Sequence, residues 1–250
     1  MDNNNDLLYW KLGQMNAAKG YAAAAKGKPS GESMSAGEIA IRAGNTVGWY
    51  DFTDATTFTN DGGGKISSWR DKLLSGHDLS APTSGSRPLL TANGILFDAS
   101  NNNYMVTDNF TYDQPMQVYA VCRQVTWTNA DYLWDGTVNN AALAQFGTTP
   151  ALVLYAGSSP EPSNTNMTLN VFHLIRTLCH GANSFIQIDD TAKATGNPGT
   201  GAPGGISLAC ARGVSALANA EYKELIFRNV ADDATTYAAI ADYLIAKYSL

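Results

Sequence analysis

The chain has few charged residues and no long apolar run, and both shortages restrict what it binds. Only 15% of its 250 residues are charged, and 22 acidic residues outnumber 16 basic ones. Nucleic acid is therefore not expected as a partner, because neutralising phosphates takes clustered lysine and arginine. No apolar stretch approaches the ~20 residues that span a bilayer, and Met1–Asp6 does not resemble a signal peptide, so we expect no membrane partner.

Cysteine is also scarce. The three cysteines cannot all pair within one chain, and each lies in or beside an apolar segment: Cys122, Cys179 and Cys210. A reduced cysteine in such a segment packs as a small hydrophobic residue. Reduced thiols fit assembly in a reducing cytoplasm.

The shortage of glutamate argues against a glycoside hydrolase. Such an enzyme needs two carboxylates that flank the scissile bond. The chain has five glutamates, and Glu221 and Glu224 are three residues apart, which on a regular strand directs them to opposite faces. The three histidines show neither metal-binding nor catalytic-triad spacing: His77, His173 and His180. We therefore expect no enzyme, with no catalytic residue, no metal site and no required cofactor.

What the chain does contain is a series of strand-length segments separated by glycine, proline, asparagine and aspartate. The strongest is 116–125, where Val118, Ala120 and Cys122 alternate with the residues between them. About eleven such segments are followed by one helix, which Asp232 or Asp233 caps and which runs to about residue 248. This order predicts a mainly β fold, a two-sheet antiparallel sandwich over residues 46–250 with a C-terminal helix.

Residues 1–45 differ from the rest and predict an N-terminal arm. The segment 6–26 has helical spacing, and 27–44 is rich in glycine, proline and serine, which indicates a linker. The helix could pack on its own sandwich or attach to another chain, through the apolar side chains of Leu8, Trp10, Leu12 and Met15.

Four segments of residues 47–250 resemble the laminin-G-like, concanavalin A-like jelly-roll domains found in many phage and bacterial surface proteins. They are Trp49-Tyr50-Asp51 followed by ISSWRDK (66–72), ILFDASNNNYM (95–105), NSFIQIDDTAKATGN (183–197) and AEYKELIFRN (220–229) with a final helix ending YLIAKYSL. The second departs from the family's F-D-G-S-N-D-Y pattern, with Ala99 in place of glycine, and Asp189-Asp190 stands where the family has a short N-G turn. The resemblance implies a jelly-roll form of the sandwich, but one fold hosts many functions.

Sugar recognition uses an aromatic ring for the apolar side of the sugar, with amides and carboxylates for its hydroxyls. The candidates are Trp127, Asp131, Trp134, Asp135, Asn139, Asn140 and Tyr155, all near predicted loops. Trp134 could equally belong to the core, as we expect for Trp49 and Trp69. Relatives often bind Ca²⁺ through loop carboxylates; Asp51, Asp54 or Asp98 could serve, but the spacing does not require calcium.

These observations lead to a hypothesis of a non-enzymatic bacteriophage virion protein: a head decoration, head fibre or tail-associated subunit. Residues 1–45 would attach to other virion proteins, and the jelly roll would face outward and bind host-surface polysaccharide weakly. We expect a homo-oligomer, assembled in the host cytoplasm and located in the virion. The alternatives are a freestanding lectin-like module and, less favoured, a glycoside hydrolase.

Overall fold

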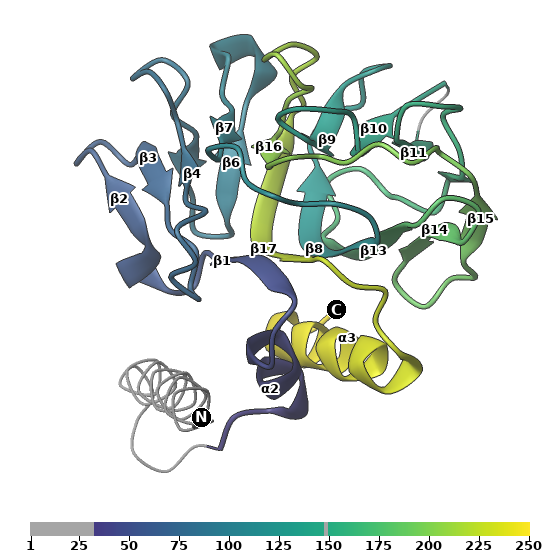
Figure 1. Cartoon of the computed structure of the whole chain (residues 1–250). Helices are drawn as coiled ribbons and strands as arrows, with labels where there is room; N and C mark the ends of the chain where they lie inside the picture. Colours follow the sequence, from purple (N-terminus) through teal and green to yellow (C-terminus); the bar gives the residue numbers. More distant parts are fainter. Residues whose placement is uncertain (1–32, 148–149) are drawn as a thin grey trace, which may run out of the picture. The chain divides into compact units, whose positions relative to one another are not determined.

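The computed structural model describes residues 33–147 and 150–250, in which two antiparallel sheets face each other (Figure 1). One sheet, here called sheet A, has the order β15 (Ala194–Gly196), β14 (Ser184–Ile188), β13 (His173–Cys179), β8 (Met116–Gln124), β17 (Ala220–Arg228), β6 (Ile95–Phe97) and β5 (Leu89–Leu90), with β1 (Thr46–Asp51) also paired to β17. The predicted two-sheet sandwich is confirmed.

The second sheet, sheet B, has nine strands. Their order is β12 (Ser163–Asn164), β11 (Leu152–Tyr155), β10 (Ala142–Gln145), β9 (Tyr132–Asp135), β16 (Ser207–Leu208), β7 (Met105–Val106), β4 (Leu79–Ser80), β3 (Ile66–Trp69) and β2 (Phe58–Asn60). Two 3₁₀ turns, η2 (Ala55–Thr57) and η3 (Ala99–Asn101), begin at the capping side chains of Asp54 and Asp98.

The main core lies between the sheets. Val118, Ala120 and Cys122 of β8 point into it, whereas Tyr119 and Val121 point out of the sandwich, as the predicted alternation requires. The strand is buried on both sides because helices cover the outer face of sheet A. Trp69 belongs to the main core, as expected.

The second apolar cluster lies between sheet A and two helices, α2 (Ala36–Arg42) and α3 (Ala234–Tyr248). Trp49 is buried here, outside the space between the sheets. The cap of α3 is Asp233, whose side chain accepts from Thr236 N at 2.7 Å. Helix α3 is confirmed, but the interpretation of 27–44 as a linker is wrong for 36–42: Ile41 is fully buried, and this burial stabilises a seven-residue helix.

Several sheet B strands were not predicted from the sequence. β4 and β12 have only two residues each, too few to show a period, and their pairing partners define them. In sheet A, β13 begins at His173, although the alternation in the sequence runs from Thr168 to Leu178. The predicted helix 6–26 lies outside the described residues. No helix of the described chain is both long and apolar enough for a membrane span.

Candidate functional site

A β-bulge in β9 decides which side chains face the outside of sheet B. Trp134 pairs with Leu143, and Tyr132 pairs with Ala144. Between these two pairs β9 advances by two residues and β10 by one. Leu133 is the additional residue. Because the bulge resets the alternation, Trp134 points into the core while Tyr132 points outward with Ala144.

A second tyrosine lies on the same outer face. Tyr155 of β11 pairs with Ala142, whose neighbour Leu143 points into the core, so Tyr155 points outward. Between the tyrosines the face is formed by small residues, and Ala144 and Val153 are only 4% and 3% exposed although they point away from the core. Neighbouring side chains must therefore cover them. Burial raises the pKa of Tyr132, and the charges of Asp135 and Tyr155 raise it further.

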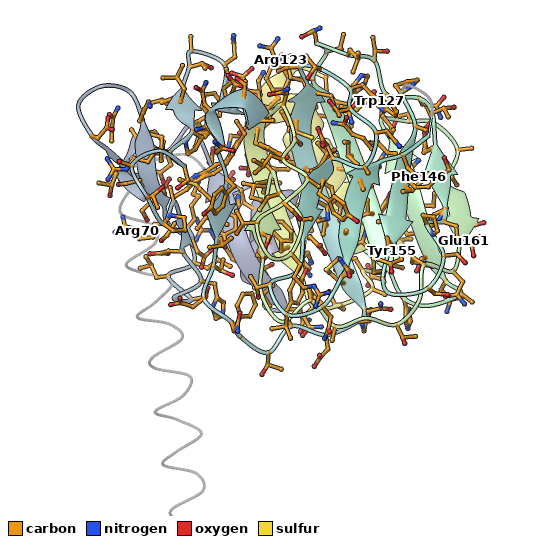
Figure 2. All side chains as sticks on the ribbon, turned by 90° about the horizontal axis from the view of Figure 1, so that it is seen from above. Arg70, Arg123, Trp127, Phe146, Tyr155 and Glu161 are labelled. Atoms are coloured by element: carbon orange, nitrogen blue, oxygen red, sulfur yellow. The ribbon has the colours of Figure 1, made fainter. Side chains whose placement is uncertain are left out.

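Phe146 extends this face beyond the end of β10. Its side chain is 45% exposed, unusual for a phenylalanine, and its backbone N–H bonds to Ala151. Figure 2 shows Trp127, Phe146 and Tyr155 following one another along one side of the molecule. We call Trp127, Tyr132, Phe146 and Tyr155 the aromatic face.

Trp127 lies in the loop that joins β8 to β9. Thr128 N donates to the side-chain oxygen of the buried Gln145 at 2.6 Å, which ties this loop to the end of β10. Asn129 accepts from Gly147 N at 2.9 Å. The indole N–H of Trp127 is buried and has no hydrogen-bond partner within the described chain. One side of its ring thus belongs to the protein interior, and the residue is half-buried overall.

Trp134, by contrast, is a core residue. It is 1% exposed and packs edge-on against Phe227 of sheet A, with ring centroids 6.4 Å apart. Of the two alternatives for Trp134, the core position is the observed one, and its ring has no exposed surface for a sugar.

Asp135 organises the loop that follows it. Its two carboxylate oxygens accept four hydrogen bonds, from Gly136 N, Ala141 N, Arg212 N and the Asn140 side chain, at 2.8–3.0 Å. Burial raises its pKa although these bonds favour the charged form. With its acceptor positions used, Asp135 shapes the face without presenting a free oxygen.

The remaining predicted residues differ in their availability. The Asn139 amide donates to the carbonyl of Ala202, and this residue is exposed, whereas the Asn140 amide donates to Asp135. Asp131 is half-buried, and burial raises its pKa. The predicted attachment residues Leu8, Trp10, Leu12 and Met15 lie outside the described residues.

The carboxylates considered for calcium have other partners. Lys72 and Lys247 both form ion pairs with Asp51, at 2.7 and 2.6 Å. Asp54 and Asp98 cap 3₁₀ turns. Within residues 33–147 and 150–250, no group of three or more histidines, cysteines and acids could hold a metal ion.

Glu221 and Glu224 lie on one face of sheet A, so the expectation of opposite faces is wrong. A second bulge, at Lys223, separates Tyr222 from Glu224 in the pairing with β8 and shifts the alternation by one residue. Glu221 pairs with Arg123, and Glu224 accepts from Trp49 and Tyr248. Both carboxylates are buried and have partners, so they do not form an accessible pair of catalytic acids on this face.

Comparison with solved structures places this architecture among domains of glycosidases. Trypanosoma rangeli sialidase in complex with the inhibitor DANA is similar with a TM-score of 0.60 and 12% identity, over 92% of this chain and 38% of the sialidase chain. The chain thus spans well under half of the sialidase. No protein-family model matches, and no curated protein matches by sequence.

A domain of an arabinanase and an arabinofuranosidase are similar as well. Domain 4 of a GH43 extracellular arabinanase from Geobacillus stearothermophilus, in complex with arabinotriose, has a TM-score of 0.52 and 12% identity, over 79% of this chain and 98% of that domain. A GH54 α-L-arabinofuranosidase has a TM-score of 0.51 and 13% identity, over 73% and 51%. At these identities the likeness establishes a shared fold, the β sandwich.

Proposed function

We propose that the aromatic face of sheet B binds carbohydrate and that the chain does not cleave it. The observation that carries the proposal is the outward placement of Tyr132 and Tyr155 around a strand of small residues, with Phe146 exposed beside them. Sugar rings present C–H faces to aromatic rings and hydroxyls to the polar edge. A tyrosine supplies both an apolar ring and a hydroxyl.

The spacing of the face suits an oligosaccharide. Tyr132 and Tyr155 stand on β9 and β11, on either side of β10, so about 10 Å of sheet separates the strands that carry them. The structural neighbours support this function, since an arabinanase domain with this fold is in complex with arabinotriose. Asp135 supports a non-catalytic role, because its oxygens are all engaged.

The experiment is a binding titration of the full chain with arabinotriose and with a panel of neutral and sialylated oligosaccharides. Tyr155→Ala and Tyr132→Ala should each weaken binding at least about tenfold, which corresponds to ~1.4 kcal/mol. Tyr155→Phe should retain most of the affinity, because it keeps the ring.

Tyr104→Ala is the matched control. Tyr104 is also a half-buried tyrosine, but it precedes β7 and lies outside the aromatic face. Binding that survives both aromatic-face variants, or a panel with no ligand at all, would refute the proposal. Release of reducing sugar by the wild-type chain would refute its non-catalytic part.

The virion role and the location in a virion stay predictions. The neighbouring structures favour carbohydrate binding, and the proposed attachment segment 1–45 lies mostly outside the described residues. A chain that lacks 1–35, which keeps α2 on the sandwich, should fail to co-sediment with particles if this segment is the anchor. Normal incorporation of the shortened chain would contradict it.

A further inference from the structure

A second surface combines charge with aromatic rings, on the outer face of sheet A. The ammonium of Lys223 lies 4.1 Å from the ring centroid of Phe172 and 5.4 Å from that of Tyr248. The guanidinium of Arg123 lies 5.0 Å from the Phe172 ring. Two cations thus contact one half-buried phenylalanine. Figure 2 shows Arg123 well apart from Tyr155, and the two residues lie on different sheets, Arg123 on β8 of sheet A and Tyr155 on β11 of sheet B.

The bulge in β17 places Lys223 here. Tyr222 pairs with Cys122 and Glu224 with Val121, so Lys223 is the residue without a partner across the ladder. Bulges re-aim a side chain locally and are frequent beside functional sites.

The charges at this surface are not balanced. Arg123 forms an ion pair with the buried Glu221 at 2.6 Å, which uses that carboxylate. Within the described chain Lys223 has no ion pair or side-chain hydrogen bond, only its two ring contacts. Burial lowers the pKa of Lys223; the charge of Glu221 raises it, and the smaller effect of Arg123 lowers it. An anion bound beside Lys223 would offset the cost of burying its charge.

The surroundings are apolar. Val171 is 45% exposed beside Phe172, and Tyr248 stacks on Phe52 with ring centroids 6.4 Å apart. A bare inorganic anion gains nothing from such rings, whereas a sugar carboxylate brings a C–H face along with its charge.

We propose that Lys223, Arg123 and Phe172 form a second binding site, which takes a carboxylate-bearing sugar such as a uronic or sialic acid unit. Lys223 binds the carboxylate, and the Phe172 ring contacts the sugar ring. Arg123 adds positive potential while Glu221 holds it in place. This site does not depend on the aromatic face of sheet B.

The test compares glucuronate with glucose, which differ only at C6, a carboxylate in the first and a hydroxymethyl group in the second. It uses the full chain with ¹H–¹⁵N chemical shifts as the readout. Glucuronate and N-acetylneuraminate should shift the amides around Lys223 and Phe172, and glucose should not. Acetate at the same concentration should produce a weaker response. Equal responses to acetate and glucuronate would reduce the site to an anion site and overturn the proposal.

Lys193→Met is the matched control for Lys223→Met. Lys193 also lies over two rings, 4.0 Å from Phe185 and 4.3 Å from Tyr237, beside an arginine, Arg176. Methionine keeps the aliphatic stem over the ring and removes the charge. Lys223→Met should weaken glucuronate binding at least tenfold, Lys223→Arg should restore it, and Lys193→Met should leave it unchanged.

Three further results would overturn the proposal. Equal weakening by both lysine variants would indicate a general charge effect, and unchanged binding in Lys223→Met would show that the lysine only covers the rings. If glucuronate caused no change in any amide chemical shift, the proposal would also be wrong. Tyr155→Ala should not alter glucuronate binding, so failure of this site and failure of the aromatic face are distinguishable.

Discussion

Trp49 donates its indole N–H to Oε1 of Glu224 at 2.6 Å, which connects β1 to the outer face of β17. The same glutamate accepts from Lys247 at 2.6 Å, and Lys247 also contacts Asp51 at 2.6 Å. Helix α3 is therefore held to sheet A by a buried charge network as well as by apolar contacts. Because burying charges is costly, such a network stabilises the fold only while every member has its partner.

Removing the lysine from this network should destabilise the protein strongly. Lys247→Met keeps the apolar stem but leaves Glu224 fully buried with no cation, and Asp51 with Lys72 alone. We expect a loss of about 3 kcal/mol in the free energy of unfolding, measured by urea denaturation. Lys65→Met, at a lysine without an ion pair in the described chain, should change stability by less than about 0.5 kcal/mol. Similar values for the two variants would contradict the structural role.

Stability should fall at acid pH because of Asp51. Burial alone would raise its pKa, but Lys247 and Lys72 outweigh burial and lower it from 3.8 to about 2. A carboxylate with a lowered folded-state pKa contributes stability above its unfolded pKa and loses it as the pH falls through the folded value. The loss should therefore span pH 4 to 2 and amount to about 2 kcal/mol.

Urea denaturation between pH 2 and pH 6 measures this loss. Asp51→Asn should flatten the acid limb of the stability profile. The effect of Glu224 on stability has the opposite pH dependence. Burial, and next the charge of Asp51, raise its pKa, so its contribution to the free energy of unfolding is larger at mildly acidic pH than at neutral pH. An acid limb that is unchanged in Asp51→Asn would assign the loss to other carboxylates.

Trp134→Ala should behave as a core truncation. The side chain is almost fully buried against Phe227, so its removal leaves a cavity that costs about 3–5 kcal/mol. If Trp134 instead stacked on a sugar, the variant would keep its stability and lose binding. Denaturation midpoints together with a binding titration separate these outcomes.

The three cysteines should remain unreactive in the native protein. Cys122, Cys179 and Cys210 are free and fully buried. Burial raises the pKa of all three thiols, with Asp135 adding to the effect at Cys179 and Cys210, which reach about 12. Since the thiolate is the reactive form, iodoacetamide at pH 8 should label none of them until urea unfolds the chain. Mass spectrometry counts the labels; a label acquired by the folded protein would contradict the prediction.

The sequence predicted those elements whose pattern is long enough to show a period. Strand β8 alternates over nine residues, and the fifteen-residue helix α3 begins with a capping aspartate, so local chemistry sufficed for both. The turn at Asp189 was also predicted, and the residue has a positive φ of 47° there. In the aromatic face, Trp127 and Tyr155 were predicted, while Tyr132 and Phe146 were missed.

Bulges explain much of what sequence reasoning missed. Plain alternation places Tyr132 and Trp134 on one face, and the additional residue Leu133 puts them on opposite faces. Plain alternation likewise puts Glu221 and Glu224 on opposite faces, and the additional residue Lys223 brings them to the same face. A bulge leaves no period in its own strand, because it exists only relative to the partner strand. The sequence by itself determined the β class, the long strands and the final helix. The tertiary structure decided which side chains face outward, since that depends on pairing between segments far apart in the chain.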